Sequence, residues 1–248
     1  MEIDEREIRS ELLSPAGRVV MLSGGSTGIG AAIARRLIID GYSVSLGGRR
    51  PKEIEGKFAD CANSPLVARF DALEPASAEA WLRATLDRFG RLDALINNAG
   101  RIRPLSFADG EESVLDELWA VNVKAPFRLI KLALPHLARS GHGRIINIAS
   151  TDAKRYRDAS VSIAYAATKH AVLALSHAAK FAGWEHGVRV TALCPGAVDT
   201  DFIAGLPGVS PGRIAPTSIA EAAAFLLRLP NNSSVAELVV NSRLEPTL

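Results

Sequence analysis

The sequence has few of the features that mark extracellular, metal-binding or membrane proteins. It contains 2 cysteines in 248 residues, which excludes a small secreted domain stapled by disulfides. Its 5 histidines are scattered without metal-ligand spacing, so we predict no metal site. It shows neither a secretory signal nor an apolar run of about 18 residues or more, so we expect no membrane partner and a reducing, cytoplasmic location.

The sequence also lacks a strong charge imbalance, internal repeats and low-complexity linkers. Its 29 Lys and Arg residues are balanced by 27 Asp and Glu residues, which gives no reason to expect nucleic acid as a partner. Residues 1–14 are rich in charge, from Glu2 to Arg9, and we expect a flexible arm outside the fold. The rest, residues 15–248, is long enough to form one large α/β domain.

What the sequence does contain is a repeated alternation of short apolar segments and helix-like segments. The strand candidates are residues 19–22, 43–46, 66–70, 94–97, 144–148, 189–194 and 238–241. The helix candidates are residues 29–40, 77–89, 114–137, 162–184 and 218–229. This pattern predicts a single doubly wound domain of Rossmann type, with a seven-stranded parallel sheet flanked by helices. Ligands of such sheets bind beyond the carboxyl ends of the strands.

Tyr165 and Lys169 are four residues apart on a predicted helix, so their side chains share one face. A nearby ammonium favours the ionised form of a phenol, so we expect Lys169 to lower the pKa of Tyr165. A tyrosine of that kind exchanges protons near neutral pH, as general acid–base catalysis requires. The alternative is an incidental polar pair on a helix.

A glycine-rich segment, Ser23-Gly24-Gly25-Ser26-Thr27-Gly28-Ile29-Gly30, follows the first predicted strand and opens the first long helix. Glycines allow a tight turn and let backbone N–H groups approach a pyrophosphate, whose charge the helix N-terminus favours. We therefore expect Gly24, Ser26, Thr27, Gly28, Ile29 and Gly30 to bind a dinucleotide. The alternative, a plain flexible loop, does not account for the position between strand and helix.

The second predicted strand ends in Gly47-Gly48-Arg49-Arg50, where folds that prefer NAD usually carry an acid. Guanidinium groups suit a 2′-phosphate, so Arg49 and Arg50 predict a preference for NADP(H) over NAD(H). The alternative is an ordinary basic turn.

Two further segments follow predicted strands and complete the expected nucleotide site. After the third strand, Asp71 and Ala72 offer a carboxylate that can accept from an adenine amino group. After the fourth, Asn98, Ala99 and Gly100 are small enough to let a cofactor lie against the backbone. Each segment taken singly is also compatible with a plain turn.

Taken together, these motifs resemble those of the short-chain dehydrogenase/reductase family over nearly the whole chain. The matching pieces are Ser23-Gly24-x-x-x-Gly28-x-Gly30, Asn97-Asn98-Ala99-Gly100, Asn122, Ser150, Tyr165-x-x-x-Lys169 and Pro195-Gly196-x-x-x-Thr200. They occur in the family's order and at family-like spacing. The resemblance implies a dinucleotide-binding half at about 15–100 and a catalytic and substrate half at about 101–248.

The resemblance also implies a role for each matching residue. Tyr165 would be the acid in reduction and the base in oxidation, and Lys169 would bind the nicotinamide ribose. Ser150 would hydrogen-bond the substrate oxygen, and Asn122 would hold a water of the proton relay. The residues expected to border the nicotinamide are Pro195, Gly196, Val198 and Thr200.

Asn122 has a further feature that the sequence itself shows. Pro126 lies four residues later and has no N–H to donate, so in an α-helix the carbonyl of Asn122 would be left free for a water. A simple proline kink is compatible with the same pattern.

The chain departs from the family's pattern at several places. Ser23 replaces the usual threonine, Thr191 stands where many members have asparagine, and Ser150 and Tyr165 are fifteen positions apart, slightly more than is usual. Residues 201–212 form a short expected substrate lid, and no glycine-rich tail follows the last strand. The C-terminal segments resemble members that act on small polar substrates such as 3-hydroxy acids.

Two loops expected to flank the substrate carry an excess of cations: Arg101, Arg103, Lys154, Arg155 and Arg157. Such charge beside a cleft attracts anions, so we hypothesise an anionic substrate. Solvated or inter-subunit charge is the alternative.

The sequence thus predicts an NADP(H)-dependent oxidoreductase that transfers hydride reversibly between nicotinamide and a small carbonyl or secondary alcohol of the 3-oxo/3-hydroxy acid type. A dinucleotide-binding redox sensor with little turnover is the alternative. The resemblance further implies a homodimer or homotetramer assembled through helices around 114–137 and 162–184. The sequence does not specify the substrate itself.

Overall fold

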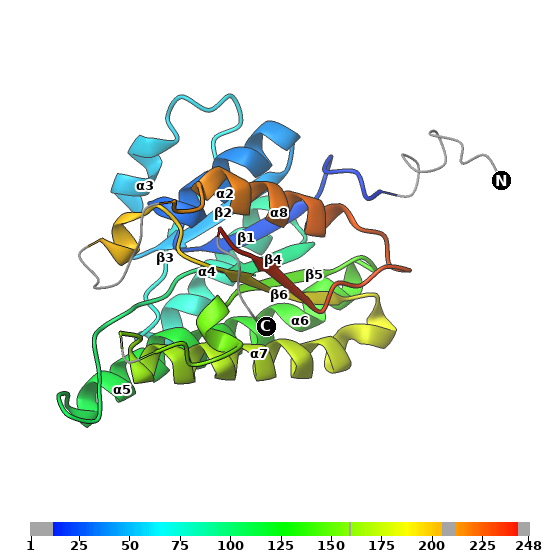
Figure 1. The fold of residues 1–248 in the computed structure, drawn as a ribbon. Coiled ribbons are helices and arrows are strands. Elements are labelled where there is room, and N and C mark those ends of the chain that lie inside the picture. The colour runs from blue at the N-terminus through cyan, green and yellow to red at the C-terminus, as the bar shows by residue number, and fades with distance from the viewer. Residues whose placement is uncertain (1–11, 159, 205–211, 243–248) are drawn as a thin grey trace.

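The computed structural model describes residues 12–158, 160–204 and 212–242 as a parallel sheet between two layers of helices (Figure 1). The strands are β1 (Val19–Ser23), β2 (Ser43–Gly48), β3 (Leu66–Arg69), β4 (Ala94–Asn97), β5 (Arg144–Ile148), β6 (Arg189–Pro195) and β7 (Glu237–Val240). They form one seven-stranded sheet in the order β3-β2-β1-β4-β5-β6-β7, and every neighbouring pair is parallel. The chain adds β2 and β3 on one side of β1 and then adds β4 to β7 on the other side, so the strand order reverses between β1 and β4. Sheets of this kind bind ligands at that position.

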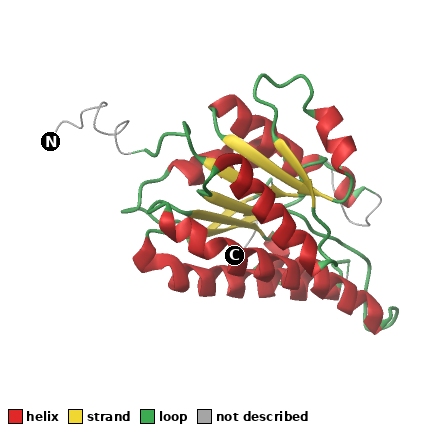
Figure 2. Cartoon of the chain, turned by 180° about the vertical axis from the view of Figure 1, so that it is seen from behind, coloured by secondary structure: helices red, strands yellow, loops and turns green. Residues whose placement is uncertain are grey.

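The helices cover both faces of the sheet (Figures 1 and 2). The α-helices are α2 (Gly28–Asp40), α3 (Pro51–Lys57), α4 (Pro75–Phe89), α5 (Glu112–Trp119), α6 (Ala125–Arg139), α7 (Ile163–Gly183) and α8 (Pro216–Arg228). Helices α2 and α8 pack together on one face, while α4, α6 and α7 cover the other. The predicted doubly wound fold is therefore confirmed.

Both faces of the sheet are closed by apolar cores. One core packs Leu22 and Ile96 of the sheet against Leu37 of α2 and Ile219 of α8. The other packs Met21 and Leu95 against Trp81 of α4, Leu129 of α6 and Ala179 of α7, among others. Each large apolar side chain buried in this way contributes about 1.5–3 kcal/mol. This double coverage explains why the strands read as continuous apolar runs.

The structure departs from the predicted elements in two regions. Helix α3 was not among the predicted helices, because Ile54 is its one buried residue and no apolar period is visible. The predicted helix 114–137 is interrupted: α5 and α6 are separated by a π-helical turn, Ala120–Lys124, which contains Asn122. Single π-turns inside α-helices often occur at functional sites.

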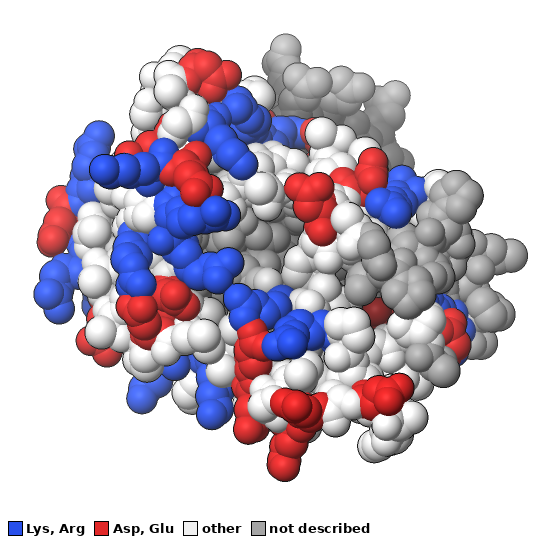
Figure 3. Space-filling model, turned by 90° about the vertical axis from the view of Figure 1, so that its left-hand side faces the viewer, with Lys and Arg blue, Asp and Glu red and all other residues white. Residues whose placement is uncertain are grey.

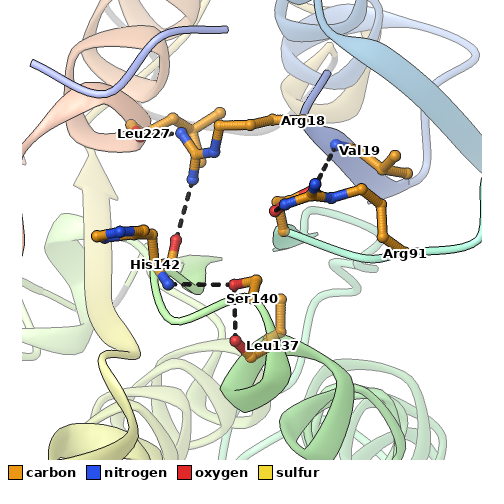
Figure 4. Close-up of polar contacts among 8 residues, drawn as sticks. Arg18, Val19, Arg91, Leu137, Ser140, His142 and Leu227 are labelled. Carbon is orange, nitrogen blue, oxygen red and sulfur yellow. Dashed lines mark hydrogen bonds and ion pairs between the residues drawn. The ribbon is translucent and has the colours of Figure 1, made fainter. Parts of the chain in front are cut away.

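Buried arginines hold the amino ends of the strands together. Arg18, which precedes β1, donates to the carbonyl of Leu227 at the end of α8 (2.7 Å) and to that of His142 before β5 (3.1 Å), as Figure 4 shows. Arg144, at the start of β5, donates to the carbonyls of Gly143 (2.7 Å) and Leu229 (2.5 Å). These guanidinium groups satisfy carbonyls that helix ends and loops leave without partners.

The expected N-terminal arm, residues 1–14, lies mostly outside the described residues. Of its described part, Leu13 donates its N–H to the carbonyl of Arg228 at the end of α8 (2.8 Å). No helix in the described ranges is long and apolar enough to cross a membrane.

Candidate active site

A cavity of about 400 Å³ opens at the carboxyl ends of the strands. Figure 3 looks onto this edge of the molecule and shows a hollow near the centre of the face, with Lys and Arg side chains gathered along one side. The predicted residues that line the cavity are Gly24, Ser26, Thr27, Gly28, Ile29, Gly30, Arg49, Arg50, Asp71, Ala72, Asn98, Ala99, Gly100, Ser150, Tyr165, Lys169, Pro195, Gly196, Val198 and Thr200. The structure therefore brings all the predicted site residues except Asn122 to the wall of one cavity.

The glycine-rich loop between β1 and α2 is possible only because of its glycines. Gly24 has a φ of +74°, in the left-handed region that favours glycine. At Gly30, a Cβ atom would lie 2.1 Å from the carbonyl oxygen of Gly24, so no side chain fits there. The loop is thereby folded tightly onto the first turn of α2, and the helix begins at the cavity with Gly28.

Ser23 ties the loop after β1 to the loop after β4. Its hydroxyl accepts from the backbone N–H groups of Asn98 and Ala99, both at 3.0 Å. The Asn98 side-chain amide in turn donates to the carbonyls of Ser23 and Gly24, also at 3.0 Å. The hydroxyl that Ser23 retains in place of threonine thus has a structural task, and Asn98 fixes two walls of the cavity to each other.

The two arginines after β2 differ in their surroundings. Arg50 is paired with Glu53 (3.1 Å) and is largely exposed. Arg49 lines the cavity and has no carboxylate partner within the described part of the chain. Across the cavity, one oxygen of Asp71 accepts from the N–H of Leu73 at 3.0 Å, which fixes the carboxylate at the wall.

The catalytic candidates meet where β5 and α7 approach each other. Ser162 caps α7 by accepting from the N–H of Tyr165 (3.3 Å), which places Tyr165 in the first turn of the helix. Lys169, one turn on, donates from Nζ to the carbonyl of Ile148 at the end of β5 (2.7 Å). Ser150 follows β5 and is buried, as are Tyr165 and Lys169.

The expected effect of Lys169 on the pKa of Tyr165 is wrong for this arrangement. Burial raises the pKa of Tyr165 above its usual range, the charge of Asp152 raises it further, and a hydrogen bond with Ser150 acts in the opposite direction. Burial also lowers the pKa of Lys169 to about 8. The ammonium is directed at the Ile148 carbonyl, and Nζ lies 5.6 Å from the centroid of the Tyr165 ring. Desolvation of both groups therefore outweighs the attraction between their charges.

Asn122 lies behind the cavity wall and supports it. Its Oδ1 accepts from the N–H of Arg101 (2.8 Å), and its Nδ2 donates to the carbonyl of Arg101 (2.9 Å) and to the hydroxyl of Thr168 (3.1 Å). A π-turn pairs N–H groups with carbonyls five residues back, so Pro126 falls opposite Val121. The π-turn removes the α-helical premise of the argument that Pro126 frees the carbonyl of Asn122, and a free carbonyl there stays a prediction.

Several cavity residues were not predicted from the sequence. Phe202, in the 3₁₀ turn Asp201–Ile203, has its ring centroid 6.2 Å from that of Tyr165. It belongs to the predicted lid, 201–212, of which the described residues are 201–204 and 212. The other additions are Gly47, Gly48, Phe70, Leu73, Arg101, Val121, Ile148, Ala149, Asp201 and Ile203. Most of them are next to a predicted residue in the sequence, and that position is the one sign by which the sequence could have indicated them.

The basic loops do not present the free cations that the anionic-substrate hypothesis assumed. Arg101 and Arg103 both pair with Glu117 of α5. Lys154 pairs with Glu237, and Arg157 with Asp158 (2.8 Å). Of the five basic residues, Arg101 is the one that lines the cavity. Three carboxylates thus face four of these cations, so the excess of positive charge is smaller than the hypothesis assumed, and the anionic substrate stays a prediction.

Thr191 of β6 stands where many family members have asparagine. Its hydroxyl donates to the carbonyl of Val235 (2.6 Å), so it ties β6 to the segment before β7. This hydrogen bond is the contact that threonine makes at a position where many family members have asparagine.

These residues fit a nicotinamide dinucleotide. The cavity runs without interruption from the glycine loop and Arg49 to Tyr165 and Lys169. At Gly100, an added Cβ would lie 3.9 Å from Lys169 Nζ, so a side chain here would narrow the passage between the two ends. When bound, such a cofactor supplies or accepts hydride. The residues that would hold the two ends of the dinucleotide are those of the glycine loop at one end and Tyr165 and Lys169 at the other.

The motif constellation and the fold agree with a comparison of the sequence against known families. The family described as short chain dehydrogenase matches residues 18–207. The chain belongs to this family. Short-chain dehydrogenase membership accounts for the parallel sheet, the glycine loop and the Tyr165–Lys169 pair together.

Individual short-chain dehydrogenases and related reductases show the same likeness. The chain is 38% identical over 219 residues to an agropine synthesis reductase of Rhizobium rhizogenes, covering 88% of this chain and 50% of the relative. The chain thus spans about half the length of that relative. An alcohol dehydrogenase of the archaeon Thermococcus sibiricus, solved with 5-hydroxy-NADP, is similar with a TM-score of 0.83 and 32% identity (92% of this chain, 99% of the other). A 3-ketoacyl-(acyl-carrier-protein) reductase of Brucella melitensis, solved with NADH, gives 0.84 and 26% (92% and 98%).

Proposed function

We propose that this protein is an NADP(H)-dependent oxidoreductase that interconverts a small carbonyl compound and its secondary alcohol. The observation that carries the proposal is the meeting of Ser150, Tyr165 and Lys169 at one end of a cavity whose other end is the glycine loop and Arg49. In reduction, Ser150 and Tyr165 donate hydrogen bonds to the carbonyl oxygen, and Tyr165 transfers its proton to it. Those donors stabilise negative charge that develops on the oxygen in the transition state.

The proposed cofactor preference rests on Arg49. Both Arg49 and Arg50 line the cavity, but Arg50 is paired with Glu53, whereas Arg49 has no carboxylate partner in the described ranges. A 2′-phosphate accepts two charge-assisted hydrogen bonds from such a group. The relatives named above were solved with both kinds of nicotinamide cofactor, so the preference is a property of this chain's residues.

Substitution of Arg49 tests the preference directly. In Arg49→Met, the Kd for NADPH should rise about tenfold, because one charge-assisted contact is lost, while the Kd for NADH stays within about twofold. Arg50→Met is the matched control and should have the smaller effect, because Glu53 already pairs with Arg50. Titration by protein fluorescence measures both constants, and an equal loss for NADPH and NADH in Arg49→Met would refute the assignment.

The substrate is proposed to be small, and the 3-oxo and 3-hydroxy acid class is the first to test. The cavity of about 400 Å³ extends from the glycine loop to Tyr165, so the whole cofactor and the substrate have to share it. Its wall near Tyr165 is apolar at Phe202, Ile203 and Val121. The decisive experiment is a panel of hydroxy acids, keto acids and simple ketones assayed with NADP(H) and NAD(H). Turnover confined to acids supports the proposed class, and faster turnover of neutral ketones contradicts it.

A redox sensor that binds the dinucleotide without turnover is the second candidate. In that case the panel would show bound NADPH with no turnover, and Tyr165→Phe would change nothing. The shared position of Ser150, Tyr165 and Lys169 on the wall of one cavity favours the enzyme, because a sensor does not need an acid beside a substrate oxygen.

We also propose that the protein assembles as a homodimer or homotetramer through α5, α6 and α7. Large aromatic side chains are exposed on these helices, with Phe127 of α6 at 54% and Phe181 of α7 at 82%. Exposed aromatic groups of this kind mark interfaces between subunits. Sedimentation velocity decides between monomer and oligomer.

A further inference from the structure

Lys57, the last residue of α3, reaches back to the glycine loop between β1 and α2. Its Nζ donates a hydrogen bond to the carbonyl of Ser26 at 2.8 Å. Ser26 lines the cavity and precedes Lys57 by 31 residues in the sequence. None of the motifs described above includes Lys57, so a role for it has to be argued from this contact.

The backbone of Lys57 is held in place from α2. Arg35 of α2 donates from Nη2 to the carbonyl of Lys57 (2.6 Å). The guanidinium carbon of Arg35 also lies 5.2 Å from the ring centroid of Phe58, which is buried. Two hydrogen bonds thus join the end of α3 to the α2 side, one donated by Arg35 and one donated by Lys57. The ammonium of Lys57 therefore has a defined position beside the glycine loop.

The hydrogen bond from Lys57 fixes the orientation of one peptide group of the glycine loop. The carbonyl and the N–H of a trans peptide point in opposite directions, and the described peptide bonds are all trans. Because the Ser26 carbonyl is directed at Lys57, the N–H of Thr27 is directed to the opposite side. Ser26 and Thr27 both line the cavity. Lys57 thus holds the part of the loop that we expect to bind a dinucleotide.

The ammonium of Lys57 can do more than this one hydrogen bond. A lysine ammonium has three N–H donors, and one of them is directed at the Ser26 carbonyl. Lys57 is exposed and has no carboxylate partner in the described part of the chain. A hydrogen bond to an exposed carbonyl contributes little, whereas a contact between an ammonium and a phosphate is charge-assisted. The other donors and the positive charge are therefore available to an anion at this end of the cavity.

The segment that carries Lys57 is basic as a whole. Residues 49–57 contain four cations, Arg49, Arg50, Lys52 and Lys57, against the carboxylates of Glu53 and Glu55. Glu53 pairs with Arg50, which leaves Arg49 and Lys57 as the cations with a link to the cavity and without a carboxylate partner in the described ranges. NADPH differs from NADH by a 2′-phosphate, which adds about 1.5 to 2 negative charges at neutral pH. A cation fixed at this end therefore favours NADPH.

We propose that Lys57 is a specificity-determining residue, which holds the Ser26 carbonyl and adds a positive charge that strengthens the binding of NADPH more than that of NADH. The inference rests on the proposed function, because it assumes that the cavity takes a nicotinamide dinucleotide. It gives Arg49, which follows β2, a second cation from a different element, the end of α3.

Substitution of Lys57 tests the specificity without turnover. In Lys57→Met the Kd for NADPH should rise about threefold to fivefold, as expected for an exposed charge, and the Kd for NADH by less than about twofold. Lys52→Met is the matched control, because Lys52 is exposed on the same helix and has no hydrogen bond or ion pair within the described residues. Both of its constants should equal those of wild type. Titration by protein fluorescence measures them. Equal losses for the two cofactors in Lys57→Met, or no loss for either, would overturn the inference.

The dependence on salt separates a charge from a purely structural contact. Salt screens exposed charges, so the NADPH affinities of wild type and Lys57→Met should converge between about 0.05 M and about 0.5 M sodium chloride. Lys57→Arg keeps the charge and should retain most of the wild-type affinity for NADPH. A difference between wild type and Lys57→Met that is the same at both salt concentrations would overturn the inference, as would a Lys57→Arg variant that binds NADPH as weakly as Lys57→Met. Wild-type protein inactive on the whole substrate panel contradicts the proposed function instead, and the Kd values still decide the role of Lys57.

Discussion

The two ends of the sheet use buried polar groups in opposite ways. At the amino ends of the strands, Arg18 and Arg144 are buried, and each directs its guanidinium at several backbone carbonyls. Figure 4 shows the contacts of Arg18. At the carboxyl ends, Ser150, Tyr165 and Lys169 are equally buried but line an open cavity. Lys169 donates to one carbonyl where Arg144 donates to several acceptors.

This difference separates stability from chemistry within one sheet. Burial lowers the pKa of Arg144 to about 10 as it lowers that of Lys169 to about 8, so both cations bear a desolvation cost, but Arg144 offsets it with several acceptors and Lys169 with one. The amino end should therefore contribute to stability and have no role in turnover. The carboxyl end should be required for turnover and cost stability. Each substitution below tests one side of that division.

The largest effect is expected from the same substitution made at the two ends. Tyr165→Phe removes the proton donor and should lower kcat by about 10²–10⁴-fold with cofactor affinity retained. Tyr42→Phe is the matched control, because Tyr42 is also buried but precedes β2 at the amino end, under Arg18. Its kcat should stay within about twofold of wild type. Steady-state kinetics decides, and a comparable loss in both variants would remove the distinction between the ends.

The second effect concerns stability. Arg144→Met removes the guanidinium that donates to the Leu229 carbonyl and to Asn231 Oδ1, while the Gly143 carbonyl keeps the N–H of Arg189, and should lower the free energy of unfolding by about 2–4 kcal/mol. The kcat of the folded fraction should not change. Urea unfolding measures the first quantity and kinetics at low temperature the second. A stable variant with reduced kcat would mean that the amino end also serves catalysis.

The same contrast explains what could be read from the sequence. The strands, the glycine loop and the Tyr165–Lys169 spacing are local patterns, and each was visible as a run, a motif or a helical period. The π-turn at Asn122 and the short helix α3 leave no such period. The sequence does not distinguish Arg18, which is buried at the amino end of the sheet, from an ordinary surface arginine.

Long-range pairing is the part that the sequence could not show. Glu117 pairs with both Arg101 and Arg103, 14 residues or more away along the chain, which reduces the positive charge on which the anionic-substrate hypothesis rests. The pKa of Tyr165 depends on burial, and no sequence pattern reports how deep a phenol lies.

A third, smaller effect tests the backbone of the carboxyl end. Gly30→Ala forces a Cβ against the Gly24 carbonyl, which must move, so the Kd for NADPH should rise about tenfold or more. Gly56→Ala is the control, because a Cβ at this position in α3 meets no atom within 4 Å. Its affinity should be unchanged and its stability equal or slightly higher. Unaltered NADPH binding in Gly30→Ala would show that the loop adapts.

The smallest change in stability is expected from Lys169→Met, and the sign of that change is the most informative. Burial holds the pKa of Lys169 at about 8 against 10.5 for a free lysine, so below pH 8 the folded protein bears the full cost of a buried ammonium. Lys169→Met should therefore abolish turnover yet raise the free energy of unfolding at pH 7 by about 1 kcal/mol, after the lost bond to Ile148 is counted. Between pH 8 and 10.5 the unfolded chain binds more protons than the folded one, so wild-type stability gains with pH and the advantage of the variant shrinks. Urea unfolding at about pH 7 and about pH 9.5, on either side of the folded-state pKa, measures both. A variant destabilised at pH 7 would place Lys169 with Arg144 as a structural cation, and the division between the two ends of the sheet would not hold.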